Sequence, residues 1–208
     1  MELRDALTQI SEIHSQMVRA QVFRGYRSIT TAFSGLVALL ATAIQTFFIP
    51  QPPQQIYAYV GLWFGAAILC MAVVGAEMIL RSRRLQSKLQ SQLTLLAVEQ
   101  FVPTVIAGAL LTAVLIGFVP EAIYLLPGLW LILFSLGVFA SCRLLPRAAF
   151  YVAGYYLLAG LSVLMIARGP FALHPLAMGL PFGLGQLLTA AMLYHTLERG
   201  GERGRHEK

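Results

Sequence analysis

Charged residues are scarce in this chain of 208 residues, where they make up 12% of the sequence, against about 25% in a soluble globular domain. Only two cysteines are present, while hydrophobic residues make up 58% and mean hydropathy is +0.72. This balance excludes a soluble enzyme, a disordered protein and a disulfide-rich scaffold. A chain so poor in charge is expected to lie in a lipid bilayer.

The sequence also lacks the usual marks of catalysis and metal binding. It contains no CxxC, HExxH or GxSxG motif and no glycine-rich phosphate loop. Its four histidines are expected at different depths or outside the membrane, so no two of them could hold a haem from both sides. We therefore predict a protein that is not an enzyme and that carries no cofactor.

Six apolar runs are long enough to cross a membrane, which takes about 20 residues for a hydrocarbon layer of about 30 Å. A backbone in lipid must satisfy its own hydrogen bonds, and none of these runs alternates as a membrane β-strand does. The sequence predicts an all-α polytopic membrane protein whose six transmembrane helices form a domain at 29–198. They are expected at about 29–49, 57–80, 101–120, 122–142, 148–167 and 175–197.

The positions of the basic residues predict the orientation. Every Lys and Arg except Arg168 lies in the N-terminal segment, the second or fourth connection, or the tail at 199–208. The positive-inside rule places all of these segments, and so both termini, in the cytoplasm. We read the basic residues as topology determinants that also attract anionic lipid, not as a nucleic-acid surface. Because no cleaved signal peptide is recognised at the N-terminus, the first span is expected to act as its own insertion signal. The absence of eukaryotic sorting signals makes the bacterial inner membrane the expected location.

The spans also suggest three parallel helical hairpins. Each hairpin would begin with a helix containing glycine, turn near a proline and return past a Gly-Leu pair. The pairs are Gly61-Leu62, Gly128-Leu129 and Gly179-Leu180. Parallel repeats argue against the inverted halves of many transporters. The GxxxG pairs that start at Gly61 and Gly179 are expected in close helix contacts, within one chain in preference to between two copies.

The cytoplasmic rim offers one candidate metal site. His195 and Glu198 are three residues apart and share a helix face. Together with Glu77 and Glu99 they could bind a divalent metal ion if the second, third and sixth spans meet there. A plainer interpretation is favoured, in which Glu77 pairs with Arg81, Glu99 precedes a helix start and His195 is interfacial.

A path for a neutral solute is a second hypothesis. Gln186 is the polar side chain expected nearest to mid-depth, and Gly179 and Gly183 precede it on the same span. The central layer is otherwise apolar, which argues against a pump driven by ions or protons. A small carrier or pore is therefore kept as an alternative function.

Two amphipathic segments are expected on the cytoplasmic side. The first covers 1–28, where an apolar helical stripe includes Leu3, Leu7, Ile10 and Met17, and the second is a helical connection at 81–98. Such helices could lie on the inner leaflet or pack together, or they could dock on another protein.

Combining these features, the sequence favours a non-enzymatic regulatory or accessory membrane protein. Its expected partners are the lipid bilayer and either a cytoplasmic protein, bound through these helices, or a second copy of the chain. A small-solute transporter and a ligand or metal site at the rim are the alternatives.

Overall fold

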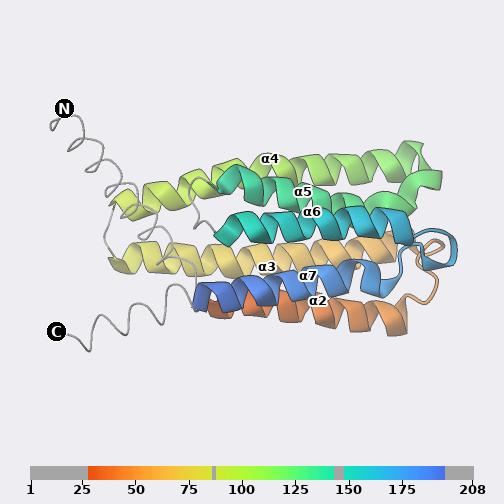
Figure 1. Ribbon diagram of the computed structural model, residues 1–208, viewed down its shortest axis with the longest axis horizontal. Helices are drawn as coiled ribbons and strands as arrows, with labels where there is room; N and C mark the ends of the chain where they lie inside the picture. The colour runs from red at the N-terminus through yellow and green to blue at the C-terminus, as the bar shows by residue number, and fades with distance from the viewer. Residues whose placement is uncertain (1–27, 86–87, 143–147, 195–208) are drawn as a thin grey trace.

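The computed structural model describes residues 28–85, 88–142 and 148–194, and these residues are helical with no strand among them. Six α-helices run nearly parallel along the long axis of the molecule (Figure 1). They are α2 (Ser28–Phe48), α3 (Ile56–Leu85), α4 (Lys88–Phe118), α5 (Leu126–Ser141), α6 (Ala148–Ile166) and α7 (Pro175–Leu193). Two short 3-10 helices, η1 (Pro120–Leu125) and η2 (Gly169–Phe171), lie in connections.

The six predicted spans are confirmed as helices that are long and apolar enough to cross a membrane. Their ends lie within a few residues of those expected from the sequence. The fourth span differs in form, because it begins with the 3-10 turn η1 at Pro120 and becomes α-helical only at Leu126. This arrangement is that of a helical membrane bundle.

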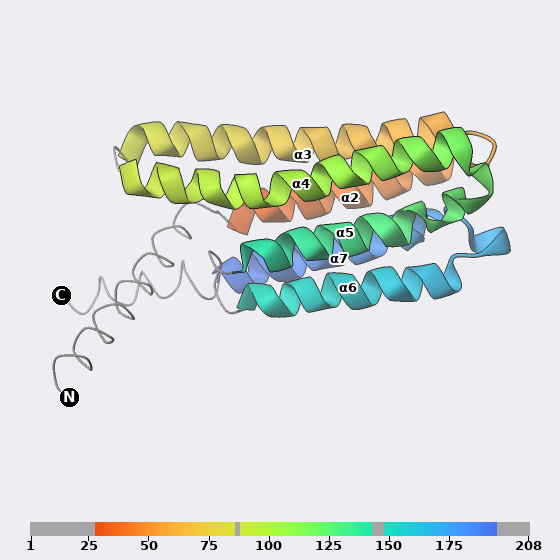
Figure 2. The same ribbon diagram turned by 90° about the horizontal axis from the view of Figure 1, so that it is seen from above.

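The helices are arranged as a ring in which each one contacts the next in the chain, and α7 closes the ring on α2. Figures 1 and 2 together show this order around the long axis. We call the end that carries the connections at 49–55, 119–125 and 167–174 the loop end. The opposite end, where α2 begins and α7 ends, is the terminal end.

Helices α3 and α4 are much longer than their neighbours. They have 30 and 31 residues, whereas α2, α5, α6 and α7 have between 16 and 21. At a rise of 1.5 Å per residue, each long helix measures about 45 Å. Figure 2 shows that the extra length projects beyond the other helices at the terminal end. The helical connection expected at 81–98 is thus largely the end of α3 and the first turns of α4.

Glycines bring two pairs of helices into backbone contact. A Cβ added at Gly160 of α6 would lie 2.9 Å from the carbonyl oxygen of Gly128 in α5, and the reverse distance is also 2.9 Å. Helices α2 and α7 meet in the same way, where Gly35 lies against Gly183 and Gly179 lies against Thr42. The GxxxG pair that starts at Gly179 therefore packs within the chain, as expected.

The seam between α3 and α4 has no such contact. Among the described residues, nothing lies within 4 Å of a Cβ added at Gly61 or Gly65, and contact between these two helices is the sparsest in the ring. Trp130 of α5 fills part of the gap, since its ring packs on Phe64 of α3 and its indole nitrogen donates a hydrogen bond to Thr112 of α4.

In two tryptophan hydrogen bonds, the donor and the acceptor are separated by the same number of residues. The indole of Trp63 donates to Gln45 and that of Trp130 donates to Thr112, and each acceptor stands 18 residues before its tryptophan. Both tryptophans follow a Gly-Leu pair in the second helix of a predicted hairpin. In the third hairpin Pro181 takes the place of tryptophan, and the threefold repeat stays a prediction.

Candidate functional site

The polar side chain of Gln45, near the loop end of α2, forms hydrogen bonds with two other segments of the bundle. It is fully buried, its Nε2 donates to the carbonyl oxygen of Leu173 at 2.8 Å, and its Oε1 accepts from the indole of Trp63 at 2.9 Å. A carboxamide buried among apolar side chains is costly unless it is paired in this way. Gln45 therefore joins α2, α3 and the connection between α6 and α7.

That connection holds Leu173 in an unusual conformation. Its φ is +58°, in the left-handed region, yet its side chain is only 1% exposed and belongs to the core. For a residue with a Cβ this conformation costs about 1–2 kcal/mol. The surroundings must supply that energy, and the Gln45 hydrogen bond to the Leu173 carbonyl is one source.

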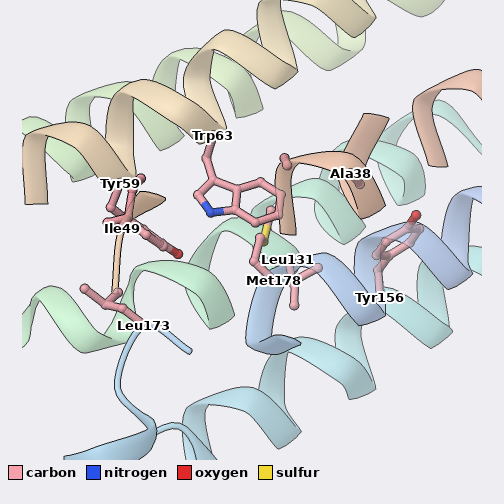
Figure 3. Packing of buried hydrophobic residues seen from close by; sticks show 9 residues of the cluster. Ala38, Ile49, Tyr59, Trp63, Leu131, Tyr156, Leu173 and Met178 are labelled. Carbon is pink, nitrogen blue, oxygen red and sulfur yellow. The ribbon is translucent and has the colours of Figure 1, made fainter. Parts of the chain in front are cut away.

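Tyr59 lies beside Leu173 in the first turns of α3, next to Ile49 (Figure 3). Its side chain is fully buried and its ring stacks on Trp130, with centroids 6.1 Å apart and planes 7° from parallel. Its hydroxyl has no hydrogen-bond partner among the described residues. A buried hydroxyl without a partner is uncommon in folded proteins and calls for an explanation.

Aromatic side chains fill the middle of the ring beyond this cluster. Phe134 of α5 packs edge to face on Tyr156 of α6 and Phe182 of α7, with centroids 4.7 and 5.0 Å apart. Tyr156 also donates a hydrogen bond to the carbonyl oxygen of Phe182. Figure 3 shows Leu131 and Met178 between Tyr156 and Trp63, so side chains occupy the axis of the ring.

The residues expected along a solute path lie where α7 packs against α2. Gly179 and Gly183 face α2, where added side chains would meet Thr42 and Leu39. Gln186 is half-buried, and a Cβ added at Gly35 of α2 would lie 3.2 Å from its Cβ. The two glycines therefore border a helix contact.

The four residues of the hypothetical metal site are only partly described. Glu77 is half-buried and accepts a hydrogen bond from Thr30, which links α3 to α2 near the terminal end, and Glu99 is exposed. His195 and Glu198 lie outside the described residues. Within the described ranges, no three His, Cys, Asp or Glu side chains gather closely enough to hold a metal ion.

The residues expected to bind a partner also lie outside the described residues: Leu3, Leu7, Ile10 and Met17.

A cavity of about 270 Å³ lies between α6 and α7. It is almost wholly apolar and is lined by Tyr151, Val152, Tyr155, Gly185, Leu188 and Met192. Tyr151 and Leu188 are largely exposed, so this cavity is a furrow in the outer surface of the bundle.

Sequence reasoning missed the cluster of Gln45, Tyr59 and Trp63, which we call the loop-end cluster. One signal was present, because Gln45 and Thr112 stand at the same distance before the two tryptophans. Nothing in the sequence links Gln45 to Leu173, which is 128 residues away. No protein-family model matches this chain, and searches of curated proteins and of solved structures gave no match either.

Proposed function

We propose that this chain is a non-enzymatic regulatory or accessory protein of a bacterial inner membrane, which contacts a partner through helices on its cytoplasmic side. One observation carries the proposal. Helices α3 and α4 continue past the terminal ends of the other helices by several turns, although about 20 residues suffice to cross the bilayer. We call this two-helix extension, residues 78–85 of α3 and 88–98 of α4, the projection.

The sequence of the projection supports a role at a surface. It contains Arg81, Arg83, Arg84 and Lys88 together with regularly spaced leucines, and clustered basic residues next to a span attract anionic lipid or an acidic partner. Helix α2 begins at the terminal end, and we propose that the amphipathic segment expected before it acts on the same side as the projection. An amphipathic helix can dock its apolar face in the groove of another protein.

Orientation is the first part of the proposal to test. A reporter that is active only in the cytoplasm, fused after Lys208, is expected to be active, and one fused within residues 51–55 is expected to be inactive. A periplasmic reporter should give the opposite pattern at the same two sites. Activity of the periplasmic reporter after Lys208 would contradict the proposed orientation.

The partner is tested by crosslinking in the native membrane. The full chain is expected to give a crosslinked product of one defined mass, and deletion of residues 2–23 should abolish it. Deletion of 199–208 is the control and should leave the product unchanged. Recovery of the same product from the chain that lacks 2–23, at an equal level in the membrane, would contradict the role of the N-terminal helix.

The rim site remains an alternative that metal analysis can decide. If it exists, purified protein should carry about one equivalent of a divalent metal, and His195→Ala or Glu198→Ala should remove it. For the carrier alternative, the supporting observation lies at the loop end, where the buried hydroxyl of Tyr59 has no hydrogen-bond partner among the described residues.

A further inference from the structure

We propose that the connection between α6 and α7 is a lid over the loop-end cluster, and that this cluster binds a small, neutral, hydrogen-bonding solute when the lid opens. The site lies at the opposite end of the bundle from the projection. Its test is therefore independent of the function proposed above.

The first reason is the strain in the lid. Leu173 is held at positive φ while its side chain fills the core beside Tyr59 and Ile49 (Figure 3). Strained backbone persists only where the surrounding structure holds it, and it is found preferentially at ligand clamps and switches. The one described side-chain hydrogen bond to the Leu173 backbone comes from Gln45, which is itself part of the cluster.

The second reason is the unused capacity of the cluster to form hydrogen bonds. The Tyr59 hydroxyl has neither a donor nor an acceptor among the described residues. When Leu173 withdraws, the Nε2 group of Gln45 also loses the carbonyl to which it now donates. An open lid would thus present a phenol hydroxyl, a carboxamide and the ring of Trp130, which stacks on Tyr59.

The chemistry of these groups defines the class of ligand. The three residues of the cluster are uncharged, and the enclosing side chains are Ile49, Leu173 and aromatic rings. A charged ligand would lose its hydration there without an opposite charge in return, which is unfavourable. A compact neutral molecule with hydrogen-bonding groups and an apolar face can use both the polar groups and the rings.

The lid is tested by thiol labelling in lipid nanodiscs. In a chain with Cys70→Ser and Cys142→Ser, Tyr59→Cys and Tyr156→Cys are treated with 2-hydroxyethyl methanethiosulfonate, a small neutral reagent. Both tyrosines are fully buried, but the hydroxyl of Tyr156 is bonded to Phe182, away from the lid. The cysteine at 59 is expected to react about tenfold faster than the cysteine at 156, because opening a connection takes less free energy than opening the whole bundle.

Leu173→Gly should increase the rate at position 59 about tenfold further, because the loss of the buried side chain that fills the site outweighs the backbone strain that glycine relieves. The rate at position 156 should not change. Equal rates at both positions, or an equal increase at both after Leu173→Gly, would show general loosening and overturn the proposal.

A second measurement avoids replacing Tyr59. The chain has two tryptophans, so Trp130→Phe leaves Trp63, which belongs to the loop-end cluster, as the only indole in the protein. Neutral acrylamide should quench its fluorescence more strongly than iodide does, and Leu173→Gly should raise acrylamide quenching about threefold. Quenching that does not respond to Leu173→Gly would refute the lid, and equal quenching by iodide and acrylamide would refute the preference for a neutral ligand.

Discussion

Alanine at Gly128 or Gly160 is expected to lower the stability of the bundle sharply. Each added Cβ would lie 2.9 Å from the carbonyl oxygen of the facing glycine, closer than a Cβ normally approaches, and a backbone atom cannot turn aside as a side chain can. Overpacking of this kind costs about 1–3 kcal/mol. In a chain of this size that corresponds to a fall in Tm of about 2–12 °C, measurable by size-exclusion chromatography after heating.

Gly61→Ala and Gly154→Ala are the matched controls. Both glycines lie in helices that are candidate spans, and no described atom lies within 4 Å of a Cβ added at either. Alanine is also the better helix former, by about 1 kcal/mol. These two variants are expected to keep or raise the Tm. A loss of stability as large as that of Gly160→Ala would show that the contact between α5 and α6 is not the cause.

Gln45→Leu is expected to lower the stability of the bundle at least as much as alanine at Gly128 or Gly160 does. The substitution leaves the indole nitrogen of Trp63 and the carbonyl oxygen of Leu173 without their partner. Leaving a buried polar group unsatisfied costs about 1–3 kcal/mol. The total for the two groups is about 2–6 kcal/mol, so the Tm should fall by about 4–24 °C. Thr112→Val, which removes the partner of the half-buried Trp130, should cost less.

A double-mutant cycle separates the two hydrogen bonds of Gln45. Trp63→Phe removes the indole nitrogen, so Gln45→Leu combined with Trp63→Phe leaves only the Leu173 carbonyl unpaired. The double variant should therefore be more stable than the sum of the single effects predicts, by about 1–2 kcal/mol. Strictly additive effects would mean that Gln45 and Trp63 do not stabilise each other.

The helices could be predicted from the sequence because the bilayer imposes a length and a polarity that the amino-acid composition reveals. The span expected at 29–49 is α2, and the span expected at 175–197 is α7 as far as the structure describes it. The length of α3 could not be predicted in the same way. The apolar run has already ended at Arg81, but helix α3 continues to Leu85. Hydropathy therefore marks the end of the apolar run and not the end of the helix.

The loop-end cluster could not be predicted because it depends on contacts between segments far apart in the chain. Gln45 is one polar residue in an apolar run, and only the closure of the ring brings Leu173 to it. The left-handed backbone at Leu173 has no sequence signal, because leucine seldom adopts that conformation. The close fit of Gly179 on Thr42 likewise depends on which helices become neighbours.

The seam between α3 and α4 gives the bundle a preferred line of separation. Interlocked backbones hold the joints between α2 and α7 and between α5 and α6. Direct contact between α3 and α4 is sparse, and the Trp130 side chain bridges these two helices through ring packing and one hydrogen bond. A sideways load on the projection acts on the two helices that border this seam. Such a load would therefore shear the ring at Trp130 before it disturbs either glycine joint, and Trp130 is stacked on Tyr59.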